Sequence, residues 1–232
     1  MSDNLLTDEK IKEGNRFLTV SNDYDSAINL YKIALELSPN FAKAYFNIGV
    51  ALYCKQNYVN AIEYYEKALE NDISDIAKTY WYIGNAYMAN KYLLEAIESF
   101  SKSINFKPTY AFAYFSMAMC YIELEDISKA IECFELAVKY KPDFALAYAR
   151  LGNIYHVHKQ YKKALKNYKK TIYYLPNFSN VYLGMSNIYF RKFNLIYSFY
   201  YSHKFMQSRK FGGEKAELQW SIANLLVINP IS

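Results

Sequence analysis

Side chains that could perform covalent or metal chemistry are few in this chain of 232 residues, and their spacing keeps them apart. Cys54, Cys120 and Cys133 are too few and too scattered for a zinc site or a disulfide framework. His156 and His158 are two residues apart, so on a helix they point to different sides and cannot easily share a metal ion. The sequence has no glycine-rich phosphate loop and no paired carboxylate site. We therefore expect a protein that is not an enzyme and needs no cofactor or metal.

Composition limits the fold class and the location. The chain has only 7 Gly and 5 Pro but 26 Tyr and 15 Phe. A β-sandwich would need more turn residues, whereas the aromatic rings supply ample apolar area for a core. The first ten residues lack the features of a signal peptide, and no run of about 18 apolar residues could cross a bilayer. We expect a cytoplasmic protein without a transmembrane segment.

Glycine and proline recur with a period near 34 residues, which indicates a repeat array. Aligning on this period gives six copies, whose small residues are Gly14, Gly49, Gly84, Ala118, Gly152 and Ser186. Tyrosine stands four residues earlier in five copies, and an aromatic residue or leucine stands three residues later, which is one face of a helix. A second face follows with the spacing of Ala61, Tyr65 and Ala68. Each copy therefore predicts two helices, and proline ends the second helix in four copies.

The pattern resembles the tetratricopeptide repeat, most clearly in residues 44–70 (AYFNIGVALYCKQNYVNAIEYYEKALE) and 147–176 (AYARLGNIYHVHKQYKKALKNYKKTIYYLP). The resemblance implies an all-α solenoid, a right-handed superhelix of six helix-turn-helix repeats plus a C-terminal capping helix. We expect an N-terminal tail at residues 1–6, the array at 7–212, and the capping helix and tail at 213–232. The expected repeats are 7–41, 42–76, 77–110, 111–144, 145–178 and 179–212.

The first and second copies depart from the family pattern. The first carries an extra residue in its inner turn, near Ser21–Asp23. In the second, Ile73 stands where proline is usual. The sixth copy is degenerate in its second helix, where residues 193–206 are apolar nearly all round.

A column of asparagines follows the small position in four of the six copies. Asparagine has poor helix propensity, and we see no packing requirement for it there, whereas an amide can both donate to and accept from a peptide backbone. Peptide-binding members of the resembled family use asparagines at this point, so the resemblance implies a peptide groove on the concave side, lined by the first helices. The alternative is that the column has no function and only reflects composition, because asparagine is abundant throughout the chain.

Aromatic residues of the third and fourth first helices are expected to hold apolar anchors of the ligand. The alternative for each ring is packing between adjacent first helices. Asn15, Asn47 and Lys78 match three positions of the two-carboxylate clamp of one subfamily, whose leading lysine and final arginine are absent here. The candidate groove residues are Asn15, Asn47, Lys78, Trp81, Tyr82, Asn85, Phe112, Phe115, Arg150, Asn153 and Asn187.

The net charge of +5 is unevenly divided. Residues 1–158 carry 15 basic and 20 acidic residues, and residues 159–232 carry 12 basic and 2 acidic residues. The lysines of residues 159–170 avoid Ala164 and Tyr168, so we interpret them as a solvated convex face. The alternatives are an acidic partner, an anionic membrane surface or nucleic acid, and nucleic acid ranks last because no RNA-recognition signature is present.

These patterns together predict a scaffold for protein–protein interaction that binds a peptide segment of a partner protein in its concave groove. The alternative functions are self-assembly through the terminal repeat, which would make a homo-oligomer, and binding of an anionic surface or nucleic acid by the basic convex face. Residues 214–228 carry a helical apolar face that we interpret as the cap of the sixth copy.

Overall fold

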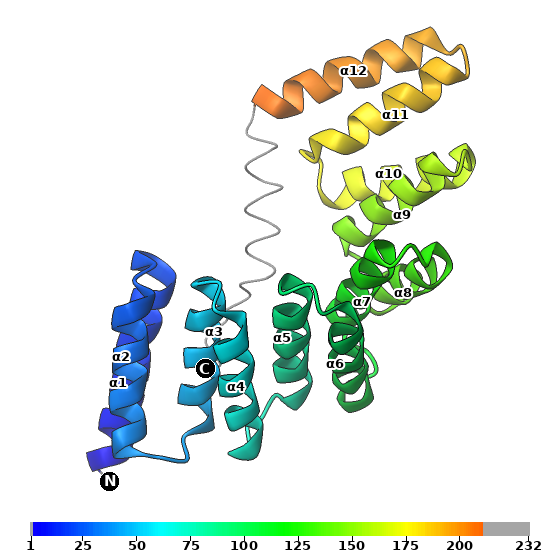
Figure 1. The fold of residues 1–232 in the computed structure, drawn as a ribbon. Coiled ribbons are helices and arrows are strands. Elements are labelled where there is room, and N and C mark those ends of the chain that lie inside the picture. Colours follow the sequence, from blue (N-terminus) through cyan, green and yellow to red (C-terminus); the bar gives the residue numbers. More distant parts are fainter. Residues whose placement is uncertain (1, 211–232) are drawn as a thin grey trace. The chain divides into compact units, whose positions relative to one another are not determined.

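The computed structural model describes the backbone of residues 2–210 and the side chains of residues 5–209. Within that part the chain forms twelve α-helices, one π-helical turn and no strand, as the sequence predicted (Figure 1). The expected capping helix at 213–232 lies outside the described residues. The helices are α1 Ser2–Arg16, α2 Tyr24–Leu37, α3 Ala42–Cys54, α4 Tyr58–Glu70, α5 Ile76–Ala89, α6 Leu93–Phe106, α7 Ala111–Glu123, α8 Ile127–Tyr140, α9 Ala145–Val157, α10 Tyr161–Tyr174, α11 Ser179–Arg191 and α12 Leu195–Lys210.

The helices fall into two compact units, one holding α1–α7 and the other α8–α12. In the first unit α1 packs against α2, α3 against α4 and α5 against α6, and the second helix of each pair also contacts the first helix of the next. In the second unit α9 packs against α10 and α11 against α12. The pairs are those that the repeat period predicted. No helix within residues 2–210 combines the length and apolarity needed to cross a bilayer.

The centre of a pair is a ring of its second helix that lies directly on the small residue of its first helix. A Cβ atom added to Gly14, Gly49, Gly84 or Gly152 would approach that ring to between 2.5 and 2.6 Å, so only glycine leaves enough space. The rings are at most 1 % exposed. We call this packing the ring–glycine contact, and its four rings are Tyr31, Tyr65, Phe100 and Tyr168.

The sixth repeat replaces this contact with hydroxyl groups. Ser186 holds the small position, and Ser202 stands where other repeats carry the ring. The Ser186 and Ser202 Oγ atoms are 2.8 Å apart, and Ser186 Oγ also donates to the Ser198 carbonyl at 3.0 Å. The degenerate second helix therefore joins its partner by hydrogen bonds instead of a buried ring.

The inner turns hold the two helices of a pair together through backbone hydrogen bonds. Gln56 and Lys159 adopt a positive φ of 61° and 58°, which ends the first helix. The next amide then donates back into that helix, from Asn57 to Leu52 at 2.9 Å and from Gln160 to Tyr155 at 2.8 Å. This geometry recurs at intervals of 34 or 35 residues in the described chain, and Phe193 adopts it again at a φ of 55°.

The two departures from the repeat pattern are accommodated locally. The extra residue of the first repeat coincides with the π-helical turn Phe17–Ser21, which adds one residue to a helical turn. Ile73 is buried, and its amide donates to the Ala68 carbonyl at 3.2 Å, a bond that the usual proline could not form.

Residues 2–6 of the expected N-terminal tail belong to the first helix. Helix α1 begins at Ser2, so most of that segment is helical. The fully buried Thr7 explains the longer helix, because its Oγ1 lies 3.2 Å from Ser38 Oγ at the end of α2 and fixes this end of α1 in place.

Candidate functional site

Two asparagines of the column hold the buried tyrosine of their own repeat. The Tyr31 hydroxyl donates to Asn15 Oδ1 at 2.8 Å, and the Tyr168 hydroxyl donates to Asn153 Oδ1 at 2.9 Å. Burial raises the pKa of both tyrosines, that of Tyr168 to about 12, so each hydroxyl keeps its proton and needs an acceptor. Asparagine therefore has a packing role at these two positions, which the sequence analysis did not find.

In the second and third repeats, which each lack one member of this asparagine–tyrosine pair, a polar atom is left buried without a partner. Two buried side-chain atoms of the described residues have no hydrogen bond, Tyr65 Oη and Asn85 Nδ2. The second repeat has the tyrosine but carries Val50 in the column, and the third has the asparagine but carries Phe100 as its ring. Both unpaired atoms thus occur where one member of the pair has been replaced.

Asn85 is instead joined to the next repeat through a buried hydrogen-bond chain. Trp81 Nε1 donates to Ser116 Oγ at 2.9 Å, and Ser116 Oγ donates to Asn85 Oδ1 at 3.3 Å. Trp81 is 5 % exposed and Asn85 is 2 % exposed. The chain connects α5 to α7 and fixes the orientation of both side chains.

Tyr82 belongs to the same buried layer. Its ring lies edge-on to Phe46 at 5.1 Å and tilted against Tyr65 at 5.5 Å, between ring centroids. Because Trp81 and Tyr82 pack between neighbouring first helices, the expectation that these rings face a ligand is corrected in favour of the packing alternative. Phe112 and Phe115 are half-buried and remain accessible, and the Phe112 ring centroid is 5.9 Å from that of Trp81.

Asn15, Asn47 and Lys78 lie on α1, α3 and α5 and are all half-buried. Asn47 Nδ2 donates to Asn15 Oδ1 at 3.1 Å, which joins the first helices of two repeats. The Lys78 ammonium lies 5.8 Å from the centroid of the Phe46 ring, and burial lowers the pKa of Lys78. No carboxylate of the described residues lies within ion-pair distance of it.

The candidate residues of the second unit are solvent-exposed, namely Arg150, Asn153 and Asn187. Asn187 lines an open cavity of about 610 Å³ beside α9, α11 and the start of α12. His156 and Arg191 also line this cavity, and the sequence reasoning missed both as binding residues. Sequence spacing could have indicated Arg191, because it stands one helical turn after Asn187. It could not have indicated His156, which comes from another helix.

The basic face of α10 is exposed as expected. Its five lysines lie in solvent, while Ala164 and Tyr168 are buried. The lysines are Lys162, Lys163, Lys166, Lys169 and Lys170.

The cysteines and metal-binding residues offer no reactive arrangement within the described part of the chain. No group of three or more His, Cys, Asp or Glu side chains there could hold a metal ion. Burial raises the pKa of the Cys54 thiol to about 11 and that of the Cys120 thiol to about 12, so both stay protonated at neutral pH.

Paired helices in repeating contact define a helical-repeat protein. Three family models match along the chain: tetratricopeptide repeat at residues 12–76, anaphase-promoting complex, cyclosome, subunit 3 at residues 54–137, and TPR repeat at residues 120–158. The chain belongs to the tetratricopeptide repeat family.

Solved structures support the same fold. MamA is 28 % identical over 69 % of this chain and 93 % of its own, with a TM-score of 0.60. PilF of Pseudomonas aeruginosa is 17 % identical over 92 % of this chain and all of its own, with a TM-score of 0.76. YrrB, described as a TPR protein with an unusual peptide-binding site, is 24 % identical over 72 % of this chain and 85 % of its own, with a TM-score of 0.54.

A curated human relative matches only a short stretch. Protein O-mannosyl-transferase TMTC1 of Homo sapiens is 40 % identical over 58 residues, which is 25 % of this chain. The matched stretch spans 6 % of that protein's length.

Removing the hydroxyl should have opposite effects at two tyrosines. Tyr65→Phe deletes a buried hydroxyl without a partner, so we expect the free energy of unfolding to rise by about 1 kcal/mol. Tyr31→Phe deletes the donor to Asn15, so we expect the free energy of unfolding to fall by about 1 kcal/mol. Urea denaturation followed by circular dichroism measures both values. A loss of similar size at both positions would contradict the role given to the asparagine column.

Proposed function

We propose that this protein is a scaffold without catalytic activity that binds a peptide segment of a partner protein on the surface formed by α1, α3, α5 and α7. The observation that carries the proposal is the amide pair of Asn15 and Asn47. Asn15 Oδ1 accepts two hydrogen bonds, whereas Asn15 Nδ2 and Asn47 Oδ1 have no partner within the described residues. Two amides joined by a hydrogen bond thus keep one donor and one acceptor for a ligand, and the backbone of an extended peptide offers the matching groups.

Two neighbouring features support the same surface. Lys78 is half-buried without a carboxylate partner, so an oxygen of a ligand would replace the water that it has lost. Phe112 and Phe115 remain accessible for an apolar side chain of the ligand. Trp81 and Tyr82 would contribute indirectly. Because they pack between neighbouring first helices, they would hold these helices at a fixed distance.

Known relatives make this a reasonable role. YrrB is described by its peptide-binding site, and we extend this property to the present chain by analogy of fold. A cytoplasmic location is part of the proposal, and the three free cysteines suit a reducing compartment.

Random twelve-residue peptides displayed on phage should yield binders to the immobilised protein. We expect the variant Asn47→Ala/Lys78→Ala to bind the selected peptides about thirtyfold more weakly in fluorescence anisotropy, because each of the two lost contacts is worth about 1 kcal/mol. This variant leaves the bond between Tyr31 and Asn15 intact.

The matched control for this experiment is Asn60→Ala/Lys32→Ala, which removes the same two residue types from exposed positions of the second helices. Its affinity should equal that of the original chain. Equal weakening by both double variants, or no enrichment of binders, would refute the proposed surface.

Self-assembly is a second candidate function, favoured by the apolar residues that α12 exposes. Ile196 is 83 % exposed and Phe199 is 77 % exposed, and the two stand three residues apart on one helix face. A second copy of this chain would bury that face.

Light scattering after size-exclusion chromatography tests this candidate on the full chain. Self-assembly predicts twice the monomer mass at about 100 μM, and the monomer mass for Ile196→Glu/Phe199→Glu. A monomer before substitution would exclude self-assembly by this face at that concentration.

A further inference from the structure

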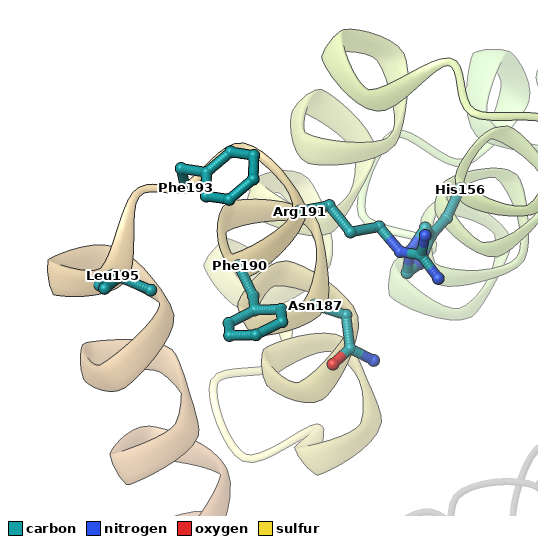
Figure 2. Close-up of a pocket in the computed structure, with 6 residues that line it drawn as sticks. All are labelled: His156, Asn187, Phe190, Arg191, Phe193 and Leu195. Atoms are coloured by element: carbon teal, nitrogen blue, oxygen red, sulfur yellow. The ribbon is translucent and has the colours of Figure 1, made fainter.

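The cavity of the second unit combines cationic, amide and aromatic side chains in one place. Asn187, Phe190 and Arg191 reach it from the last turns of α11, and His156 reaches it from α9 (Figure 2). Phe193 and Leu195 complete its wall from the turn into α12. We refer to these six residues as the α9–α11 cavity.

Two polar groups of the cavity, those of Arg191 and Asn187, are not paired with other side chains of the described residues. Arg191 is exposed, and within the described residues no carboxylate pairs with its guanidinium. The Asn187 amide likewise has no side-chain partner there. A planar guanidinium that is free on a cavity wall suits a carboxylate, which it can bind through two parallel hydrogen bonds.

His156 is fixed in one tautomer by a hydrogen-bond chain. The Tyr168 hydroxyl donates its single proton to Asn153 Oδ1, so His156 Nδ1, which is 3.3 Å from that hydroxyl, must donate to it. The second ring nitrogen, Nε2, is then the one left for a ligand. Burial and the nearby Arg191 lower the pKa of His156, so the ring is neutral at pH 7.

The apolar part of the cavity is unusually open. Phe190 is 64 % exposed, Phe193 is 92 % exposed and Leu195 is 61 % exposed. The turn fixes Phe193, because its amide donates to the Phe190 carbonyl at 2.9 Å while its φ is 55°. Exposed aromatic rings on a fixed turn, beside a free cation, are features of a recognition surface.

The helices α10, α11 and α12 carry charge of a single sign. Residues 159–210 contain eleven Lys and Arg residues and no Asp or Glu. The helices α10, α11 and α12 therefore attract acidic segments and supply no carboxylate that could compete with them.

We propose that the α9–α11 cavity binds an acidic peptide segment of a partner protein, with an Asp or Glu carboxylate of the segment on Arg191 and Asn187 and an adjacent aromatic or aliphatic side chain on Phe190 and Phe193. This site is separate from the surface of α1, α3 and α5, and it uses a different chemistry. It needs a carboxylate on a side chain, whereas the proposed first surface binds the peptide backbone.

A fluorescein-labelled peptide library tests the proposal on the full chain. Its members carry Asp or Glu on both sides of Phe or Leu and end in an amide, so that all carboxylates are on side chains. We expect saturable binding in fluorescence anisotropy, and at least tenfold weaker binding of the same library with Asn and Gln in place of Asp and Glu. Equal binding of the two libraries, or no binding, would overturn the proposal.

Two substitutions locate the binding. Arg191→Gln should weaken the acidic library about tenfold, whereas Lys170→Gln, which removes the same charge from an exposed position of α10, should leave it unchanged. Phe193→Gly should also weaken it, and glycine is suited to the positive φ at this position, so the turn is kept. Equal weakening by Arg191→Gln and Lys170→Gln would mean non-specific attraction and would overturn the site.

The pH dependence gives an independent readout. A bound carboxylate raises the pKa of His156, so binding should tighten from pH 7.5 to pH 5.5, and His156→Gln should remove this change. The charged and titratable groups that face His156 are Arg191 of α11 and Tyr161 and Tyr168 of α10, and burial raises the pKa of Tyr168 to about 12. Binding that is independent of pH would place the carboxylate away from His156 and contradict the arrangement.

The variant Asn47→Ala/Lys78→Ala separates this proposal from the proposed function. It should bind the acidic library as tightly as the original chain does. Loss of binding in this variant would move the acidic peptide to the first unit and overturn the cavity assignment.

Discussion

The ring–glycine contact is the interaction on which the rest of this structure depends. Four second helices place a ring where a Cβ atom of the first helix would otherwise stand, and the ring is at most 1 % exposed in each case. The close approach joins two amphipathic helices into a pair whose centre is buried. The ring–glycine contact costs free energy when the ring is a tyrosine, because the hydroxyl is then buried as well and needs an acceptor.

This requirement explains much of the polar pattern on the first helices. Asn15 and Asn153 serve the buried hydroxyls, and Asn85, whose repeat carries Phe100, is joined to the next repeat through Ser116. A candidate binding surface therefore consists of the groups that packing leaves unused. By that criterion the first unit offers the free amide atoms of Asn15 and Asn47, and the second offers Arg191 and Asn187.

The sequence predicted the helix pairs, because a period near 34 residues and the alternation of small and aromatic positions depend only on helical geometry. It also contained the pairing of Asn15 with Tyr31 and of Asn153 with Tyr168. That pairing was not recognised because residues 15 or 16 apart on two helices meet only at a particular rotation of each helix. The burial of Trp81 and Tyr82 depends in the same way on how closely neighbouring repeats approach. The α9–α11 cavity could not be predicted because Arg191 lies in a basic stretch of sequence and its neighbour His156 belongs to another repeat.

A double-mutant cycle tests the central role of the ring–glycine contact most directly. Gly152→Ala should lower the free energy of unfolding by about 2 kcal/mol in the original chain, because the new methyl group would lie 2.5 Å from the Tyr168 ring. In a Tyr168→Leu background the same substitution should raise the free energy of unfolding by about 0.5–1 kcal/mol, since alanine favours a helix more than glycine does. An equal loss of stability in both backgrounds would contradict the account.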